Sequence, residues 1–435
     1  MTRQSEKVAF VPLSNLINRA RKNAKAEIKR CAMCLMVETN ETMTFDDEGV
    51  CNICQSFRQR DQWNLDEKEK EFLEIIEPYR GKHLYDAIVP FSGGKDSSWV
   101  AYVLAKKYKM KILLVTYDSN FRRPLHLRNI DRLVRKLGCD QVTFRSNNDV
   151  IRKTMLETLK RKGDFCWFCH TGVCSFPMKT AIRYKVPLII WGEPNSEYAA
   201  YTRYEVEARR IGEEPVGTEK AFNRIMNLGI NAKDMIGFID GVEERDLEPF
   251  RFPELHEFKE LNKLNYRNIC LGDYFKWDPI RQIKILEKEL GWTSAEVEGL
   301  HPMYSGEKVE CYLQGVRDHL RYIKRGYSRT NQRSNAEIRR GTLSREDALE
   351  QEKYDARKPA SLPVILNYLG ITEEEFNEIA LSHTISPWAY DPSAAKEGPA
   401  LPDHDLWVDA LQPEKKSLDV QDKAQHIISE LETAE

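Results

Sequence analysis

One short segment of the chain combines two glycines with residue types that bind phosphate. Residues 92–98 read Ser-Gly-Gly-Lys-Asp-Ser-Ser, directly after an apolar run at Tyr85–Phe91 and at the start of an amphipathic helix at Ser97–Tyr108. Adjacent glycines let backbone N–H groups approach a phosphate, and a helix N-terminus adds partial positive charge. A carboxylate among phosphates requires a cation, so Asp96 predicts a magnesium ion. The residues that we expect to bind phosphate are Ser92, Gly93, Gly94, Lys95, Ser97 and Ser98.

The spacing of this segment excludes two common phosphate-binding motifs. It lacks the Gly-x-x-x-x-Gly-Lys-Ser/Thr pattern of the Walker A loop, and it is not the dinucleotide fingerprint. The alternative interpretation is a simple glycine turn capped by serine. The strand before the segment and the helix after it favour a phosphate loop.

Four cysteines near the N-terminus have the spacing of a zinc ribbon. Cys31 and Cys34 form one Cys-x-x-Cys pair, Cys51 and Cys54 form another, and sixteen residues separate the pairs. Four thiolates close a tetrahedral zinc site with no open coordination position, which indicates a structural role. Contact with RNA is the alternative, because basic residues precede the ribbon, but the ribbon itself contains few lysines or arginines.

A second cysteine group lies in a predicted loop and contains Cys166, Cys169, His170 and Cys174. Three interpretations stay open: a redox or persulfide pair, a metal or iron–sulfur site, or packing without chemistry, as is usual for buried cysteine. The segment around Cys174 lacks the second glycine of a nucleophile elbow, so we interpret it as a core residue. The chain begins Met-Thr-Arg and shows no glutaminase nucleophile, so any ammonia would come from solution or a partner.

These residues require a scaffold, and the hydrophobic pattern predicts an α/β fold. Apolar runs at residues 85–91, 111–117, 141–144 and 188–191 alternate with helical segments, which is typical of a doubly wound parallel sheet. Such sheets bind ligands beyond the carboxyl ends of their strands. Asp118, Gly192 and Glu193 follow two of these strands. Beyond Glu193 the sequence is polar and helical, with no evident strand.

Length, charge and hydropathy limit the classes of protein to consider. The 435 residues predict two or three domains, and the formal net charge of −2 argues against general binding to nucleic acid or acidic membranes. We see no secretory signal and no apolar stretch of roughly 18 residues. We therefore expect a cytoplasmic protein with reduced cysteines and no membrane association.

Residues 92–97 resemble the Ser-Gly-Gly-x-Asp-Ser signature of the PP-loop ATP pyrophosphatases. Further segments narrow the resemblance to the N-acetyl sugar amidotransferases of surface-polysaccharide biosynthesis. The resemblance covers roughly residues 31–380, and the segments before and after that range fall outside it. The segments that carry it are Phe45–Cys51, Cys169–Gly172, Leu188–Tyr198, Leu271–Pro279 and Gly315–Arg329.

The resemblance implies a five-stranded PP-loop domain that uses ATP and Mg²⁺ beside a structural Zn²⁺. ATP would adenylate the acetamido oxygen of a nucleotide-linked N-acetyl sugar, and ammonia would then displace AMP. The products would be an acetamidino sugar, AMP and pyrophosphate, in the biosynthesis of LPS O-antigen or another surface polysaccharide. The resemblance also implies a separate glutaminase subunit that supplies ammonia, with a cyclase-like companion subunit.

Expected roles for individual residues follow from this chemistry. Asp118 is placed to meet adenosine, and Gly192 is placed to border the reacting centre. The expected catalytic residues are Lys95, Asp96, Glu193 and, as a proton carrier, His319. A basic stretch suits the phosphates of the sugar nucleotide, although a solvated helix face is the alternative. The expected substrate-binding residues are Asn195, Tyr198, Arg317, Tyr322, Lys324, Arg325 and Arg329.

We expect a basic extension at residues 1–30, a zinc ribbon at 31–60, the PP-loop domain at 80–200, a helical substrate-binding region at 201–383 and a tail at 384–435. The alternative function is a tRNA-thiolating PP-loop enzyme that uses Cys166 and Cys169. The near-neutral net charge disfavours it and makes nucleic acid an unexpected partner. The intact Lys95 and Asp96 disfavour a non-catalytic ATP-binding subunit.

Overall fold

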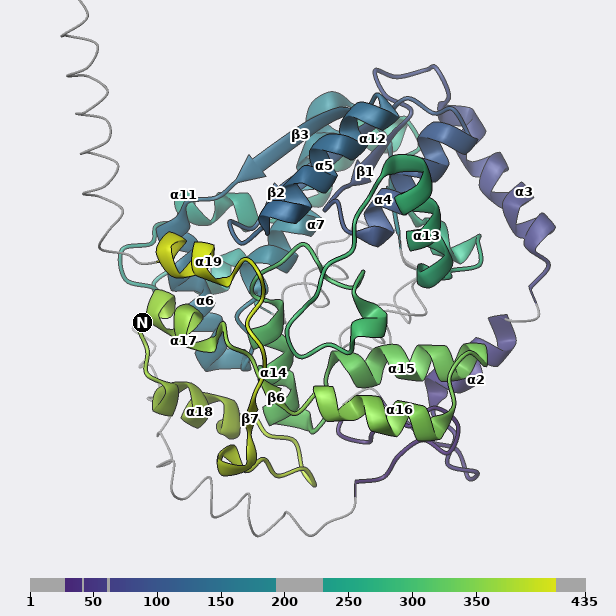
Figure 1. Ribbon diagram of the computed structural model, residues 1–435. Helices are drawn as coiled ribbons and strands as arrows, with labels where there is room; N and C mark the ends of the chain where they lie inside the picture. The colour runs from purple at the N-terminus through teal and green to yellow at the C-terminus, as the bar shows by residue number, and fades with distance from the viewer. Residues whose placement is uncertain (1–27, 41–42, 61–62, 193–229, 412–435) are drawn as a thin grey trace, which may run out of the picture.

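The computed structural model of the chain describes residues 28–40, 43–60, 63–192 and 230–411 (Figure 1). Most of the basic extension and three predicted site residues, Glu193, Asn195 and Tyr198, lie outside the described residues. Within the described ranges, no helix is both long enough and apolar enough to cross a membrane.

A five-stranded parallel sheet forms the centre of the molecule, as predicted. The strands stand in the order β3-β2-β1-β4-β5, and every neighbouring pair is parallel. Their bounds are β1 Ala87–Pro90, β2 Ile112–Asp118, β3 Asp140–Arg145, β4 Leu188–Trp191 and β5 Arg267–Cys270. The chain order reverses between β1 and β4, and ligands of such sheets bind beyond the carboxyl ends of strands at this reversal.

Strand β5 corrects the expectation that no strand follows Glu193. Its sequence, Arg-Asn-Ile-Cys, is short and largely polar, and none of its residues is fully buried. It pairs with β4, with Leu188 opposite Arg267. An edge strand is covered less completely than a central one and therefore lacks the continuous apolar run that identifies buried parallel strands.

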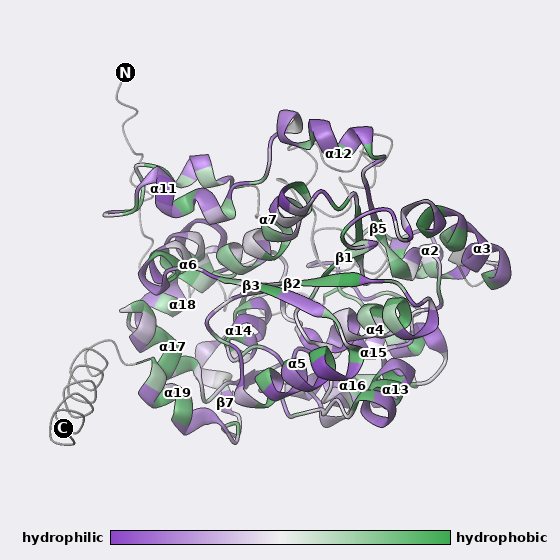
Figure 2. Ribbon diagram, turned by 90° about the horizontal axis from the view of Figure 1, so that it is seen from above, coloured by the Kyte–Doolittle hydropathy of each residue, from purple (hydrophilic) through white to green (hydrophobic). Residues whose placement is uncertain are grey.

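Helices cover both faces of the sheet. Their bounds are α4 Lys95–Tyr102, α5 Pro124–Leu137, α6 Asn148–Lys162, α7 Trp167–Tyr184, α12 Lys259–Lys263 and α13 Pro279–Leu290. Successive side chains of a strand point to opposite faces. Accordingly, Ala87 and Val89 pack in one cluster with α4, α5 and α13, and Ile88 packs in another with α7 and α12. Figure 2 shows these two helical layers on either side of the strands.

Local signals in the sequence explain where α13 begins and why the start of α7 was predicted as a loop. Pro279 opens α13, and the Asp278 side chain accepts a hydrogen bond from the Arg281 N–H at 3.1 Å, which is typical of a helix start. The cysteine-rich stretch expected as a loop instead forms the first turns of α7. Pro177 lies inside that helix, where proline ordinarily marks a boundary.

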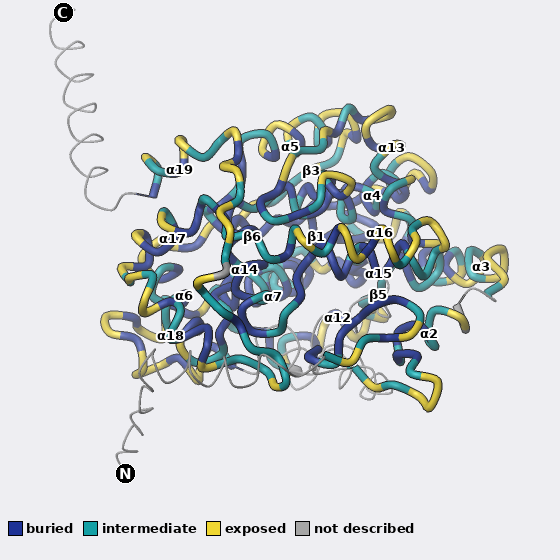
Figure 3. The backbone as a smooth tube through the Cα atoms, turned by 60° about the horizontal axis from the view of Figure 1, so that its bottom comes forward, coloured by how far each residue is buried: buried dark blue, intermediate teal, exposed yellow. Residues whose placement is uncertain are grey.

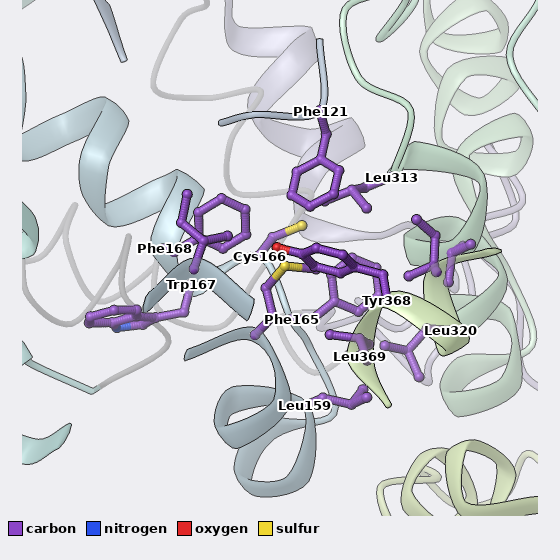
Figure 4. Close-up of a cluster of buried hydrophobic side chains, with 14 of the residues drawn as sticks. Phe121, Leu159, Phe165, Cys166, Trp167, Phe168, Leu313, Leu320, Tyr368 and Leu369 are labelled. Atoms are coloured by element: carbon purple, nitrogen blue, oxygen red, sulfur yellow. The ribbon is translucent and has the colours of Figure 1, made fainter. Parts of the chain in front are cut away.

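The rest of the described chain forms a helical region that shares a core with the sheet. Its elements are α11 Glu244–Leu247, α14 Gln314–Arg325, α15 Arg329–Arg340, α16 Arg345–Gln351, β6 Arg357–Lys358, α17 Leu362–Leu369, α18 Glu373–Ser382, β7 Lys396–Glu397 and α19 His404–Ala410. Cys166 and Phe168 of the α7 start pack with Leu320 of α14 and Tyr368 of α17 (Figure 4). Buried residues are concentrated in the middle of the molecule, and exposed residues lie at its periphery (Figure 3).

The N-terminal cysteine segment docks on two of these helices. Together with α2 (Asn52–Arg60), it precedes α3 (Leu65–Ile76), which leads to the sheet. Arg345 of α16 donates hydrogen bonds to the carbonyls of Cys31 and Ala32, at 3.1 and 2.7 Å. Ile338 of α15 packs against the cysteine cluster. The ribbon is therefore part of the helical region rather than a separate module.

The described part of the predicted tail, residues 384–411, also packs onto the molecule. Trp407 of α19 stacks on Tyr312 with ring centroids 4.6 Å apart. Arg123, which precedes α5, forms an ion pair with Asp403 at 2.8 Å. The many prolines of this segment suggested a loose tail, but its aromatic and charged side chains anchor it as far as Leu411.

Candidate active site

The segment between β1 and α4 forms a tight turn that only glycine can make. Gly93 has φ +80°, and a Cβ atom there would lie 2.4 Å from Cγ1 of Ile130 and 2.9 Å from Cε1 of His126. Gly94 is the N-cap of α4. The turn therefore stands at a helix N-terminus, at the carboxyl end of the central strand, as the sequence predicts for a phosphate loop.

Two serine hydroxyls lie where the N–H groups of the turn converge. The Ser97 hydroxyl oxygen accepts hydrogen bonds from the N–H groups of Ser92 and Gly93, at 3.2 and 3.1 Å. The Ser92 hydroxyl oxygen accepts one from the N–H of Gly94 at 3.2 Å. Ser98 is fully buried, and its hydroxyl has no hydrogen-bond partner among the described residues. Such converging N–H and hydroxyl groups fit an anion.

Side chains from distant parts of the sequence donate hydrogen bonds to the carbonyl groups of the turn. The Ser92 carbonyl accepts hydrogen bonds from Nη1 of Arg122 at 2.9 Å and from Nε2 of His126 at 2.5 Å. The Gly93 carbonyl accepts one from Nε1 of Trp292 at 3.0 Å. Burial lowers the pKa of His126 to about 4, so its ring is neutral at pH 7 and donates from Nε2. Fixing the carbonyls in this way orients the N–H groups toward the interior of the turn.

Lys95 is buried at the first position of α4 and is bound by two carboxylates. Its Nζ lies 2.5 Å from Oδ2 of Asp96 and 2.7 Å from Oε2 of Glu307, a residue of the helical region. The carboxylate of Glu310 lies beside Gly94, about where a Cβ on that glycine would point. Burial alone would raise the pKa of Glu310, but the charge of Lys308 keeps it below its ordinary value.

The ends of β2 and β4 supply two further predicted residues. Gly192 follows β4, and a Cβ there would lie 3.4 Å from Cβ of Asp96, so the end of β4 lies beside the loop. The Asp118 carboxylate at the end of β2 is bound by Arg145, with Nε at 2.8 Å, and by Arg122, with Nε at 3.4 Å. These arginines fix Asp118 at the edge of the loop.

The side chains of the predicted basic stretch, from Arg317 to Arg329, contact different parts of the structure. Nη1 of Arg329 lies 3.5 Å from Oε1 of Glu307, the carboxylate that binds Lys95, so Arg329 is brought to the loop. Nη2 of Arg317 lies 2.9 Å from Oδ2 of Asp164, at the start of α7. Both arginines are largely buried and paired, so they do not form a solvated helix face.

Two other members of the stretch form their hydrogen bonds outside the loop. Lys324 donates a hydrogen bond to the Gly163 carbonyl at 2.6 Å, at the end of α6. The carbonyl of Arg325 accepts a hydrogen bond from the Thr39 hydroxyl of the ribbon at 2.5 Å. Lys324 thus provides a hydrogen-bond donor for a carbonyl at the C-terminal end of α6. The hydrogen bond to the Arg325 carbonyl connects the end of α14 to the ribbon.

Tyr322 and His319 belong to an aromatic group on α14. The ring of Tyr322 lies 5.4 Å from that of Trp388 and 6.0 Å from that of Tyr390. His319 lies edge-on to Tyr390 at 6.1 Å. Burial, together with nearby Lys358, lowers the pKa of His319 to about 4. These rings pack between α14 and the C-terminal segment.

The second cysteine group divides between two hydrophobic clusters. Cys166 packs with the helical region, and Cys174 packs beneath the sheet. Burial raises the pKa of Cys169 to about 11 and that of Cys311 to about 12, so both thiols are protonated at neutral pH. This arrangement favours the packing interpretation.

The four N-terminal cysteines come together in one cluster, as their spacing predicts. All four are buried, and their Sγ atoms lie within 4.8 Å of one another. Cys31 and Cys54 have Sγ atoms 3.9 Å apart, and Cys34 and Cys51 have theirs 3.7 Å apart. Four sulfurs around zinc at about 2.3 Å are separated by about 3.8 Å. Over the described residues, no other group of three or more Cys, His, Asp or Glu ligand atoms meets the same spacing.

Several side chains that contact the loop were not predicted from the sequence. Arg122 had a signal, because it lies four residues after Asp118 near a strand end. The others come from segments without a motif, and only the fold brings them to the loop. These are His126, Trp292, Glu307 and Glu310.

The fold and site define an α/β protein with a candidate phosphate loop and a closed four-cysteine centre. Residues 304–397 match the family model described as LPS biosynthesis protein WbpG-like, C-terminal domain. This match relates the region from Tyr304 to β7, and no other part of the chain, to the C-terminal domain of WbpG-like proteins. A search of curated proteins gives no match.

Removing one cysteine ligand should release the metal and loosen the ribbon. We expect Cys51→Ser to lose most bound zinc and to lower the unfolding temperature, because structural zinc contributes directly to folding. Metal content and thermal unfolding of the purified chain check this. The control is Cys139→Ser, a half-buried cysteine outside the cluster, which should keep both. Wild-type zinc content in Cys51→Ser would contradict the assignment.

Gly93→Ala should abolish nucleotide binding. Gly138 also has positive φ, +65°, but a Cβ there meets no atom within 4 Å. Gly138→Ala thus reproduces the backbone cost, roughly 1 kcal/mol, without the clash. Calorimetric titration with Mg-ATP should show binding to Gly138→Ala and none to Gly93→Ala. Equal binding by the two variants would show that the turn is not a phosphate loop.

Acid should weaken the fold partly through His126. Its pKa is about 4 in the folded chain and about 6.5 when unfolded, so the unfolded chain takes up the proton first as pH falls. This group therefore stabilises the fold above pH 6.5, and the contribution, on the order of 3 kcal/mol, is lost between pH 6.5 and 4. His126→Gln keeps a donor for Ser92 and should lose less stability over that range in urea unfolding. Identical pH dependence of the two proteins would refute this.

Proposed function

We propose that the chain is an ATP-dependent amidotransferase that converts the acetamido group of a nucleotide-linked sugar into an acetamidino group for LPS biosynthesis. The observation that carries this proposal is the contact between Lys95 and Glu307. It joins the candidate phosphate loop to the region that matches the WbpG-like family. A loop suited to ATP thereby lies against a region related to LPS biosynthesis.

The fit of the loop to a nucleotide rests on the turn itself. Gly93 leaves no room for a side chain, and the N–H groups of the turn converge beside two hydroxyls. Ser92, Gly93, Gly94, Ser97 and Ser98 would bind phosphate oxygens. Lys95 would balance their charge, and Asp96 would hold Mg²⁺. ATP, when bound, would supply the AMP group that turns the amide oxygen into a good leaving group.

Adenylation of the amide oxygen would release pyrophosphate. Ammonia from a separate glutaminase subunit would then attack the same carbon and displace AMP, which carries away the former amide oxygen. Two thiols near the loop are in a protonation state that does not suit the alternative reaction, sulfur transfer. Cys169 and Cys311 have raised pKa values and are protonated at neutral pH, whereas sulfur transfer requires a thiolate. This favours the amidotransferase over the alternative, a tRNA-thiolating enzyme, which also receives no support from the family match.

The test is a direct assay of the purified chain. We expect Mg-ATP, ammonium and a UDP- or CMP-linked acetamido sugar to give AMP and a sugar whose mass shows replacement of O by NH. Asp96→Asn, which removes the charge that would hold Mg²⁺, should lower the rate at least about 100-fold. Thiolated tRNA formed with a sulfur donor, without any modified sugar, would establish the alternative instead.

A further inference from the structure

Three cations from two regions of the chain surround one buried carboxylate, that of Glu307. Nζ of Lys95 lies 2.7 Å from Oε2, Nη1 of Arg329 lies 3.5 Å from Oε1, and Nη1 of Arg333 lies 3.6 Å from Oε2. The four side chains are between 4% and 11% exposed. The loop supplies Lys95, and α15 supplies both arginines.

Helix α15 holds the two arginines in place. Arg329 and Arg333 are four residues apart and therefore lie on one face of the helix. The Asp355 carboxylate accepts hydrogen bonds from the N–H groups of Ser328 at 2.7 Å and Thr330 at 2.8 Å, which fixes the start of α15. Toward its other end, α15 packs on the ribbon. The arginines are thus directed toward the loop by anchored backbone.

Glu307 is a poor match for the two guanidinium groups. Charge-assisted hydrogen bonds to carboxylates are about 2.7–2.9 Å long, and only the Lys95 contact has that length. One carboxylate has two oxygens, whereas a pyrophosphate offers more oxygens and more charge, in a geometry that suits planar guanidinium groups. A pyrophosphate group would therefore offer the three cations more acceptor oxygens than Glu307 does; Arg329 also contacts the Asp318 carboxylate, at 3.4 Å.

We infer that Lys95, Arg329 and Arg333 form one binding site for the pyrophosphate part of a nucleoside triphosphate, and that Glu307 is the internal carboxylate that this group displaces. The inference rests on the proposed function, because it assumes that the loop receives ATP. It assigns Arg329 to ATP rather than to the sugar nucleotide, and it adds Arg333, which the sequence analysis did not select. The WbpG-like region then supplies part of the ATP site.

Calorimetric titration of the full chain with Mg-pyrophosphate, Mg-ATP and UDP tests this assignment. We expect Arg333→Ala to weaken binding of pyrophosphate and ATP at least about tenfold, with UDP unaffected. Arg333→Lys, which keeps the charge, should lie between Arg333→Ala and wild type. The control is Arg340→Ala on the same helix, where the arginine pairs with Glu337 at 2.7 Å, and it should bind as wild type. Thermal unfolding of each variant verifies folding.

The substitution Glu307→Gln should change pyrophosphate binding in the opposite direction from Arg333→Ala. It keeps the size of the side chain and removes the competing charge, so pyrophosphate should bind more tightly. Unchanged pyrophosphate binding by Arg333→Ala, or weakened UDP binding alone, would overturn the inference while leaving the proposed function intact. Weaker pyrophosphate binding by folded Glu307→Gln would overturn it as well. If wild type binds no ATP at all, the proposed function fails together with the inference.

Discussion

The buried ion pair between Lys95 and Glu307 connects the two halves of the molecule, and the arrangement of the candidate site depends on it. The ammonium group belongs to the first turn of α4, and the carboxylate belongs to the segment before α14. A buried charge is costly unless it is paired. Each charge has a partner in its own half, Asp96 for Lys95 and Arg329 for Glu307, and the Lys95–Glu307 pair adds a contact between the halves. The pair brings the sheet and the region that matches the family model into contact at the candidate phosphate loop.

The same dependence on distant segments shapes the turn between β1 and α4. The carbonyls of Ser92 and Gly93 are held by Arg122, His126 and Trp292, which lie 30 to 199 residues away along the chain. Glycine permits the conformation of the turn, but these donors select it from the many that glycine allows. A short flexible motif thus obtains a defined shape from its surroundings.

This dependence explains how much could be predicted from the sequence. Strands β1 and β2 are buried on both faces and appear as continuous apolar runs, so the sheet was predictable. The turn was predictable because Gly93, Lys95 and Asp96 are neighbours in the chain. Strand β5 was not predictable, because a polar edge strand carries no continuous apolar run. The contact of Glu307 with the loop was not predictable, because only long-range packing brings it to Lys95. Arg333 had a weak signal, its spacing of four residues from Arg329, that could have placed both on one helical face.

The position of α15 between the four-cysteine centre and the loop would couple metal binding at the centre to anion binding at the loop. Ile338 and Arg339 near one end of the helix adjoin the cysteines, and Arg329 at the other end reaches the carboxylate bound to Lys95. Thermodynamic linkage is reciprocal, so a metal that orders this helix and an anion that engages its arginines must each favour the binding of the other. A centre with no open coordination position can in this way govern affinity at a site that it never touches.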